Sequence, residues 1–289
     1  MSDLGPGVRR LEILTDDGVT LAVHCAGDPE GIPVVLVPGT FSNHTFWLGT
    51  RGTGFARALA TAGYDAWALD PRGHGDSQRP RRGDHWDFDD WARRDVPAAV
   101  RAAAARGRGV VLVGHSAGGA TALIACAVLP DVRGAVRALV VVATPIPWLQ
   151  SMRRLATLFA VGVSRLFGRF PARLVGLGPE DELGGVMVQW MTWQLEGHWR
   201  GDDGTDYEAL LAALDLPMLF VAGAGDRVEA PPAAVHALFQ LTGSRDRTFL
   251  LCGRDSGFSE DFGHATILVS RAARDEVWPR IVDWIRRTA

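Results

Sequence analysis

The chain begins with two segments in which apolar and polar side chains alternate. They span residues 8–15 and 19–26 and flank the dipeptide Asp17-Gly18. Such alternation is typical of a strand with one buried face, and Asp-Gly supplies the positive φ angles that a tight hairpin turn needs. We therefore predict that the chain opens with an antiparallel hairpin.

Six later runs are mostly apolar rather than alternating, and helix-forming stretches separate most of them. The runs are Pro33–Val37, Tyr64–Leu69, Gly109–Val113, Val136–Ala143, Pro217–Ala222 and Arg247–Leu251. Continuous apolar strands that alternate with helices indicate a parallel sheet covered on both faces. Together with the hairpin, they predict an α/β fold with a mostly parallel, eight-stranded sheet flanked by helices.

One interval interrupts this rhythm, because about 70 residues separate Ala143 from Pro217, far more than a crossover between parallel strands requires. We predict an inserted helical cap over residues 145–213. Residues 1–144 and 214–289 would then form the core domain. The final helix is expected over Ala265 to Arg287, after the last strand.

Two helices are expected in the cap. The first carries an apolar stripe spaced by three or four residues, made of Trp148, Met152, Leu155, Phe159, Val163, Leu166 and Phe170. The second begins at Pro179, where three acidic residues follow as is typical of a helix N-terminus, and it ends at Gly197. It carries Met187, Trp190, Met191 and Trp193. We interpret most of these apolar side chains as packing the cap against the body, with the others lining an apolar pocket.

Net charge, cysteine positions and the length of the apolar runs favour some classes of protein over others. The 289 residues are 47% hydrophobic with a net charge of -3, and the basic residues are dispersed among acids, so nothing favours a nucleic-acid partner. Cys25, Cys126 and Cys252 lie in apolar runs without metal-binding spacing, which indicates buried thiols in a reducing compartment. Met1 to Arg10 lacks a signal-peptide pattern, and no apolar run approaches the roughly 20 residues of a membrane span. We expect a cytoplasmic protein without integral membrane association, and the prediction allows for a homodimer.

The candidate nucleophile is Ser116, in the pentapeptide Gly114-His115-Ser116-Ala117-Gly118 between a predicted strand and a predicted helix. This is the setting of a nucleophile elbow, in which a sharp turn exposes the serine above the sheet. The glycines are needed because a Cβ at either position would meet neighbouring backbone. The side chain of His115 is expected to point away from the serine and to pack beneath the turn.

A serine nucleophile needs a base and a third group that orients the base. Among eight histidines, only His264 lies between the last strand and the final helix. For the acid we choose Asp226, in the loop that follows a strand end, with Asp255 and Asp261 as alternatives. The order serine, aspartate, histidine is the one used in α/β-hydrolases.

The oxyanion that forms on attack needs backbone N–H donors. One is expected from Ala117 at the start of its helix, and the second from Thr40, or otherwise Phe41, in the loop after the third strand. This chemistry requires no organic cofactor and no metal. Candidate substrate-binding residues are Phe41, His115, Trp148, Trp190 and Trp193.

From Val8 to Arg287 the chain resembles the α/β-hydrolase superfamily. The resemblance rests on Val37-Pro38-Gly39-Thr40, on Asp70 to Ser77, on the elbow, and on the Asp226 and His264 loops. It implies that Asp70–Ser77 is the family's structural turn after the fourth strand, so Asp70, Arg72 and His74 are not assigned to catalysis. Most members carry His-Gly where this chain has Pro38-Gly39.

A finer similarity to acid lipases and polyhydroxyalkanoate-related hydrolases lies in the Pro38 to Trp47 spacing, Trp86 to Asp90, Asp95 to Ala98, Phe262-Gly263-His264 and Glu276 to Trp278. It implies a carboxylic ester with an apolar acyl part. We expect a serine hydrolase, esterase-like or lipase-like, acting on a small apolar ester or thioester. The alternatives are a biosynthetic thioesterase, acyltransferase or lactone-forming cyclase, and a non-catalytic protein that binds an apolar small molecule.

Overall fold

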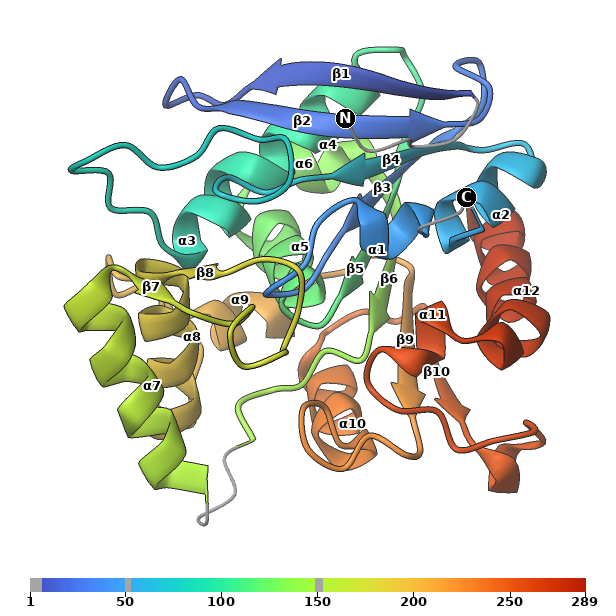
Figure 1. The fold of residues 1–289 in the computed structure, drawn as a ribbon. Helices are drawn as coiled ribbons and strands as arrows, with labels where there is room; N and C mark the ends of the chain where they lie inside the picture. The colour runs from blue at the N-terminus through green and yellow to red at the C-terminus, as the bar shows by residue number, and fades with distance from the viewer. Residues whose placement is uncertain (1–6, 50–52, 149–152) are drawn as a thin grey trace.

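The computed structural model describes residues 7–49, 53–148 and 153–289. Eight strands form one sheet (Figure 1): β1 (Val8–Leu14), β2 (Thr20–Ala26), β3 (Pro33–Val37), β4 (Asp65–Leu69), β5 (Val110–His115), β6 (Val136–Val142), β9 (Met218–Gly223) and β10 (Arg247–Cys252). Their order across the sheet is β1-β2-β4-β3-β5-β6-β9-β10. The first two pairings, β1 with β2 and β2 with β4, are antiparallel, and the others are parallel. The predicted eight-stranded, mostly parallel sheet is confirmed.

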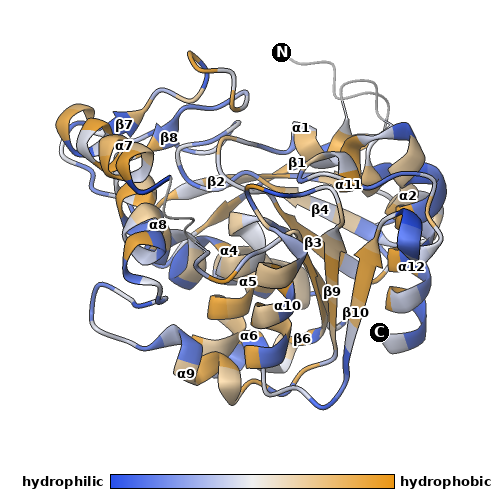
Figure 2. Cartoon of the chain, turned by 90° about the horizontal axis from the view of Figure 1, so that it is seen from below, coloured by the Kyte–Doolittle hydropathy of each residue, from blue (hydrophilic) through white to orange (hydrophobic). Residues whose placement is uncertain are grey.

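Helices cover both faces of this sheet (Figure 2). On one side lie α2 (Phe55–Thr61) and α12 (Arg271–Thr288), and on the other α4 (Val96–Ala104), α5 (Ala117–Val128) and α10 (Pro232–Leu241). The shorter helical elements of the body are α1 (Thr45–Leu48), α3 (Phe88–Asp90), the π-helical turn η1 (Trp91–Asp95), α6 (Pro130–Ala135), the 3₁₀ turn η3 (Arg254–Ser256) and α11 (Thr266–Val269). The central strands β3, β4 and β5 are buried along their whole length, which explains why their side chains are mostly apolar.

The expected single helix over Ala265 to Arg287 is divided. Ser270 separates α11 from α12, and its hydroxyl accepts the N–H of Ala273 as an N-cap. A serine that caps a new helix end leaves the apolar spacing intact on both sides, so the break has little trace in the hydrophobic pattern.

Between β6 and β9 lies the inserted segment, residues 145–213, of which 149–152 are outside the described residues. It contains α7 (Arg154–Phe167), β7 (Arg169–Phe170), β8 (Glu182–Leu183), α8 (Gly184–Glu196) and α9 (Tyr207–Ala212). The predicted end of the second helix is confirmed, because Gly197 caps α8 with a left-handed φ of 73°. The division into a core domain and a cap domain remains a prediction.

Two expectations for the inserted segment are wrong. No helix begins at Pro179, because Glu182 and Leu183 form the short strand β8 and α8 starts at Gly184. Two of the acids after Pro179, Glu180 and Glu182, instead contact the body, as described below.

The apolar stripe of α7 also does not face the body. Leu155, Phe159 and Leu166 are 80%, 71% and 76% exposed, whereas the buried positions are Thr157, Val161 and Ser164. Met152, part of the predicted stripe, lies outside the described residues. Helical periodicity identifies the stripe but not the direction in which it faces.

Candidate active site

Ser116 occupies the turn between β5 and α5 in a conformation that L residues rarely adopt. Its φ is +54° and its ψ is −123°. Hydrogen bonds hold this turn: the Ser116 N–H donates to the Val142 carbonyl at 2.9 Å, and Thr144 Oγ1 donates to the Ser116 carbonyl at 2.9 Å. The elbow is therefore fixed by the neighbouring strand β6 and the residues that follow it.

The two glycines of the elbow are required by close backbone approach. A Cβ on Gly114 would strike the carbonyl of Gly118, and one on Gly118 would strike the carbonyls of Val37 and Pro38. The second of these contacts joins the elbow to the end of β3. The expected reason for both glycines is confirmed.

Ser116, His264 and Asp226 form one continuous chain of hydrogen bonds. Ser116 Oγ lies 2.9 Å from His264 Nε2, and His264 Nδ1 lies 2.7 Å from Asp226 Oδ2. Because the carboxylate only accepts, the imidazole donates through Nδ1 and presents Nε2 as an acceptor for the hydroxyl proton. The Ser116–His264 contact spans 148 positions of the chain and the His264–Asp226 contact 38, and the three residues meet in the order proposed from the sequence.

The Asp226 carboxylate is built to remain ionised. It is fully buried, and its other oxygen accepts the N–H of Glu229 at 3.1 Å. Burial opposes ionisation, but the hydrogen bond and charge of His264 lower the pKa of Asp226 below its ordinary value. The two alternatives lie elsewhere: Asp261 Oδ1 accepts the N–H of Arg254 at 2.9 Å, and Asp255 is on the exposed turn η3.

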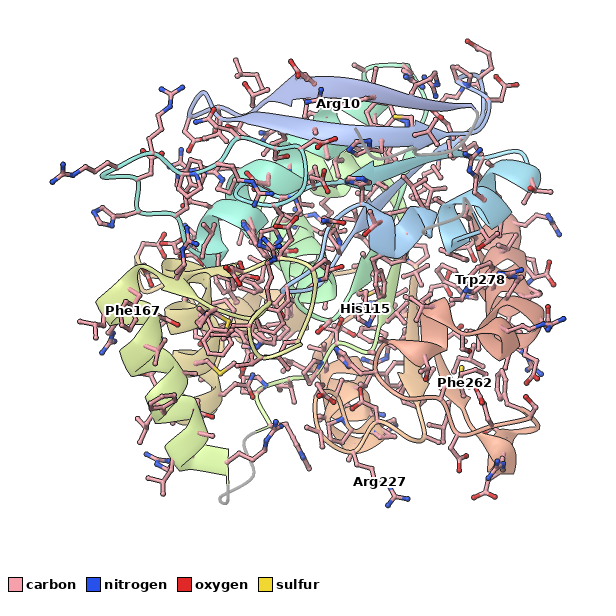
Figure 3. The ribbon with its side chains drawn as sticks, viewed as in Figure 1. Arg10, His115, Phe167, Arg227, Phe262 and Trp278 are labelled. Atoms are coloured by element: carbon pink, nitrogen blue, oxygen red, sulfur yellow. The ribbon has the colours of Figure 1, made fainter. Side chains whose placement is uncertain are left out.

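His115 supports the loop that carries His264. Its Nε2–H donates to the His264 carbonyl at 2.9 Å, and its ring stacks on Phe46 with centroids 4.6 Å apart. Burial and the neighbouring His264 lower the pKa of His115 to about 3, so the ring is neutral. The ring lies in the interior of the molecule (Figure 3), as expected for packing beneath the turn. No sequence pattern indicates its bond to the His264 backbone.

The loop after β3 packs directly on the nucleophile. A Cβ on Gly39 would lie 3.0 Å from Ser116 Cβ, so any larger residue here would crowd the nucleophile. Phe41 has a positive φ of 63°, and its N–H donates to Glu182 Oε2 at 3.0 Å. Because the Phe41 amide is occupied, Thr40 is the better candidate in this loop for an oxyanion donor. Ala117, the first residue of α5, has an N–H without an intrahelical acceptor, as at every helix start.

Two buried glutamates of the inserted segment hold this loop, and sequence reasoning missed both. Glu182 Oε1 accepts from His74 Nε2 at 3.0 Å, and His74 Nδ1 donates to the Ser42 carbonyl at 2.7 Å. Burial alone would lower the pKa of His74, but the Glu182 carboxylate raises it above its ordinary value. Because the two partners of the ring, a carbonyl and a carboxylate, only accept, both ring nitrogens donate.

Glu180 makes a second set of contacts to the same region. Its carboxylate accepts from Asn43 Nδ2 at 2.7 Å, from the Gly75 N–H at 3.0 Å and from Arg79 Nη1 at 3.0 Å. Its own N–H donates to the Phe41 carbonyl at 3.0 Å. Two of the three acids predicted to start a helix, Glu180 and Glu182, therefore hold the loop that carries Thr40, whereas Asp181 pairs with Arg169.

Comparison with known proteins agrees with this architecture. Residues 32–186, more than half of the chain, match the model of the α/β hydrolase fold. The chain belongs to the α/β-hydrolase family. No curated protein sequence matches it.

Solved structures of other α/β hydrolases share the fold. DcsB, described in complex with its substrate analogue, is 19% identical, with 98% of this chain and 100% of that chain covered and a TM-score of 0.73. A thermophilic esterase from Thermogutta terrifontis is 19% identical, with 97% and 99% covered and a TM-score of 0.66. A structure titled as a putative aryl esterase from Burkholderia cenocepacia is 22% identical, with 97% and 99% covered and a TM-score of 0.64.

The tryptophans proposed as substrate contacts lie in the inserted segment of this α/β hydrolase. Trp190 stacks on Phe88 with ring centroids 5.1 Å apart, and Trp193 packs edge-on to Phe88 and donates from Nε1 to the Arg200 carbonyl at 2.7 Å. A cavity of about 750 Å³ is lined in part by Trp193 but by none of the triad residues. Trp148 is 41% exposed. A role of these residues in binding substrate remains a prediction.

Two histidines beside the turn Asp70–Ser77 of this α/β hydrolase, His24 and His44, form with Asp70 and Asp76 a group of side chains that could also ligate a metal. His24 Nε2 lies 3.2 Å from Asp70 Oδ2 and 3.4 Å from Asp76 Oδ2, and His44 Nδ1 lies 2.8 Å from Asp70 Oδ2. Within the described residues, the opposite nitrogens, His24 Nδ1 and His44 Nε2, are buried without a partner. Histidines that ligate metal normally donate through that second nitrogen, so the cluster fits a hydrogen-bonded support for Asp70 better than a metal centre.

Proposed function

We propose that the chain is a serine hydrolase that cleaves a carboxylic ester with an apolar acyl or alcohol part through an acyl-Ser116 intermediate. The observation that carries this proposal is the unbroken hydrogen-bonded series from Ser116 Oγ through the His264 imidazole to Asp226. Serine is a weak nucleophile at neutral pH, and this arrangement supplies both the base and the group that orients it.

In the first half-reaction, Ser116 Oγ attacks the carbonyl carbon of the ester while His264 Nε2 takes the hydroxyl proton. The carbonyl oxygen becomes an oxyanion, for which the N–H groups of Thr40 and Ala117 are the proposed donors. Asp226 stabilises the imidazolium without taking its proton. Collapse of the tetrahedral species breaks the bond to the alcohol oxygen, and His264 Nε2 delivers its proton to the departing alcohol.

The second half-reaction regenerates the enzyme. Water occupies the place of the alcohol and gives one proton to His264 Nε2 as its oxygen attacks the acyl carbon. The second tetrahedral species then expels Ser116 Oγ, which recovers the proton from the imidazolium. The products are a carboxylic acid, an alcohol and the free enzyme.

An apolar substrate is supported by the side chains around the loop after β3. The rings of Phe41 and Phe170 lie 5.9 Å apart, and Phe41 adjoins Thr40 directly. Apolar lining near a few polar reacting groups is typical of small-molecule sites.

A fluorophosphonate probe with peptide mapping tests the nucleophile. We expect the probe to modify Ser116 in the wild-type protein and to label the His264→Ala variant far more slowly, because the base is gone. The Ser116→Ala variant, which should fold normally, is the matched control. Labelling at another residue, or wild-type ester turnover by Ser116→Ala, would refute the proposed mechanism.

A panel of p-nitrophenyl esters of increasing acyl length, run beside the matching acyl thioesters, tests the substrate class. We expect kcat/KM to rise from acetate to longer acyl chains, since each buried CH₂ contributes about 0.8 kcal/mol. A preference for acetate would contradict the apolar site. Faster turnover of the thioesters would instead favour a thioesterase.

A further inference from the structure

Exposed large apolar side chains are concentrated in one stretch of the inserted segment. Of the twelve such residues in the described part of the chain, eight lie between positions 155 and 177. They are Leu155, Leu158, Phe159, Leu166, Phe167, Leu174, Val175 and Leu177. We call this set the apolar face. Large exposed apolar side chains gathered in one stretch indicate a surface that meets another apolar phase rather than ordinary scatter.

The packing of α7 produces this exposure. The helix buries small or short side chains, namely Thr157, Val161 and Ser164, and Gly184 permits backbone contact with the turn of Ser164. Its large side chains therefore point outward. Figure 2 shows apolar residues along α7 at the edge of the molecule, and Phe167 projects from the outer side of this helix in Figure 3.

The same stretch is strongly basic. Residues 153–177 contain five arginines and no aspartate or glutamate. The arginines are Arg153, Arg154, Arg165, Arg169 and Arg173, and all five are exposed. Asp181, just beyond the stretch, lies 3.7 Å from Arg169. An apolar helix face bordered by arginines is the pattern of a helix that lies in the headgroup region of a bilayer.

We propose that the apolar face docks this protein reversibly on an anionic lipid surface, with α7 lying in the interface. Charge favours a membrane over a second copy of the chain, because a two-fold contact through this face would bring two sets of five arginines together. No helix in the described ranges has the length and apolar character to cross a membrane. The contact proposed is therefore peripheral.

The docking face is linked to the candidate active site. Phe170 packs on Phe41, and Glu180, just after the face, donates its N–H to the Phe41 carbonyl at 3.0 Å. Docking would bring the loop that carries Thr40 near the lipid, from which an apolar ester could reach Ser116. This second statement rests on the proposed function, whereas the docking itself does not.

Vesicle flotation tests the docking. Wild-type protein is mixed with phosphatidylcholine vesicles, or with vesicles that also contain phosphatidylglycerol, at low and high salt. We expect flotation with the anionic vesicles, much less with the neutral ones, and release by salt, since screening weakens the attraction. Absence of flotation, or equal flotation with both lipid compositions, would overturn the proposal.

Two variants separate the apolar and electrostatic contributions. The triple variant Leu155→Gln, Phe159→Gln and Leu166→Gln should lose at least about tenfold in vesicle affinity. The variant Arg154→Glu and Arg165→Glu should lose about fivefold or more for each arginine replaced.

The matched controls lie away from the apolar face. They are Leu14→Gln, on the exposed side of β1, and the pair Arg81→Glu and Arg82→Glu, on an exposed loop. The controls should float like the wild type, and a similar loss in them would overturn the proposal. All variants should keep their turnover of a short, soluble p-nitrophenyl ester, which reports folding.

Failure of the docking and failure of the proposed function give different results. Ser116→Ala should float as well as wild type, so flotation without any Ser116-dependent hydrolysis would refute only the function. Hydrolysis without flotation would refute only the docking. Sedimentation of the free protein tests the alternative that a second copy of the chain covers the apolar face. If the wild type forms a dimer, the triple variant does not, and neither protein floats with vesicles, the apolar face is a dimer interface.

Discussion

Glu182 accepts the backbone N–H of Phe41 at 3.0 Å across 141 positions of the chain. The contact joins the inserted segment to the loop that carries Thr40, the proposed oxyanion donor. Phe41 has a positive φ of 63°, which a phenylalanine adopts only when its surroundings enforce it. The inserted segment therefore helps to shape the candidate active site by holding the loop that carries Thr40, without contacting the nucleophile through Glu182.

Removing this contact should impair turnover more than substrate binding. In Glu182→Ala the Phe41 amide and His74 both lose their acceptor, so Thr40 is less firmly held where the oxyanion forms. We expect kcat for a p-nitrophenyl ester to fall by about 10-fold to 100-fold, less than the 100-fold to 1000-fold cost of losing an oxyanion donor outright. KM should change little. Steady-state kinetics on the soluble substrate measures both.

Glu182→Gln and Asp181→Asn are the controls for this positioning role. Glutamine retains an oxygen that can accept from Phe41 and should restore part of kcat. Asp181 lies between the two buried glutamates but pairs with exposed Arg169 instead, so its variant should behave as wild type. A rise in KM without loss of kcat in Glu182→Ala would contradict the argument.

The Glu182–His74 pair should also make stability depend on pH. His74 is fully buried, and the pKa of its ring is raised above the ordinary 6.5 by Glu182. The folded state therefore holds a proton that the unfolded state releases, so this contribution is complete below about pH 6.5 and declines as pH rises through the folded pKa. The difference in Tm between wild type and Glu182→Gln should be largest near pH 6 and shrink toward pH 9. Calorimetry across this range measures it, and a difference that grows with pH would show that the ring is neutral.

Sequence patterns predicted the sheet and the three candidate catalytic residues because each depends on local residue patterns or on the order of elements along the chain. Continuous apolar runs mark buried parallel strands, and the elbow has its own glycine spacing. Asp226 and His264 were found from their places after strands, since parallel strands end at a common edge.

The direction in which α7 faces and the partners of the acids after Pro179 depend on tertiary packing, which local sequence patterns do not report. The stripe of α7 faces outward because Thr157 and Ser164, rather than Leu155 or Phe159, are the side chains small enough for its close approach to α8. The acids after Pro179 fit a helix start equally well from composition alone. Their true partners, such as His74 and Asn43, lie more than 100 positions away.

The choice of Asp226 over its two alternatives can be tested by matched amide substitutions. Asp226→Asn keeps the size of the side chain but removes the charge that holds the imidazole in the productive tautomer, so we expect kcat to fall by about 10⁴-fold. Asp255→Asn and Asp261→Asn should stay close to wild type, because neither carboxylate contacts His264 in the structure. Ester kinetics on the three variants, with circular dichroism to verify folding, decides between them. A larger loss in either alternative would move the acid's role to that residue.

Gly118 should be intolerant of even one added carbon, for a reason that concerns the site as much as the fold. A Cβ added at Gly118 would meet the carbonyl oxygens of Val37 and Pro38. Gly118→Ala must therefore push the end of β3 and the following loop away from Ser116. We expect the overpacking to lower the free energy of unfolding by about 1–3 kcal/mol. We also expect kcat to fall, even under conditions where the variant remains folded, because Thr40 is moved relative to Ser116. Gly162→Ala is the matched control, because its Cβ on α7 meets nothing within 4 Å and alanine should stabilise the helix by about 0.5–1 kcal/mol. Denaturant unfolding and ester kinetics measure the two effects separately. If Gly118→Ala kept both wild-type stability and wild-type turnover, the close contact between the elbow and the loop after β3 would be wrong, and with it the placement of Thr40 beside the nucleophile.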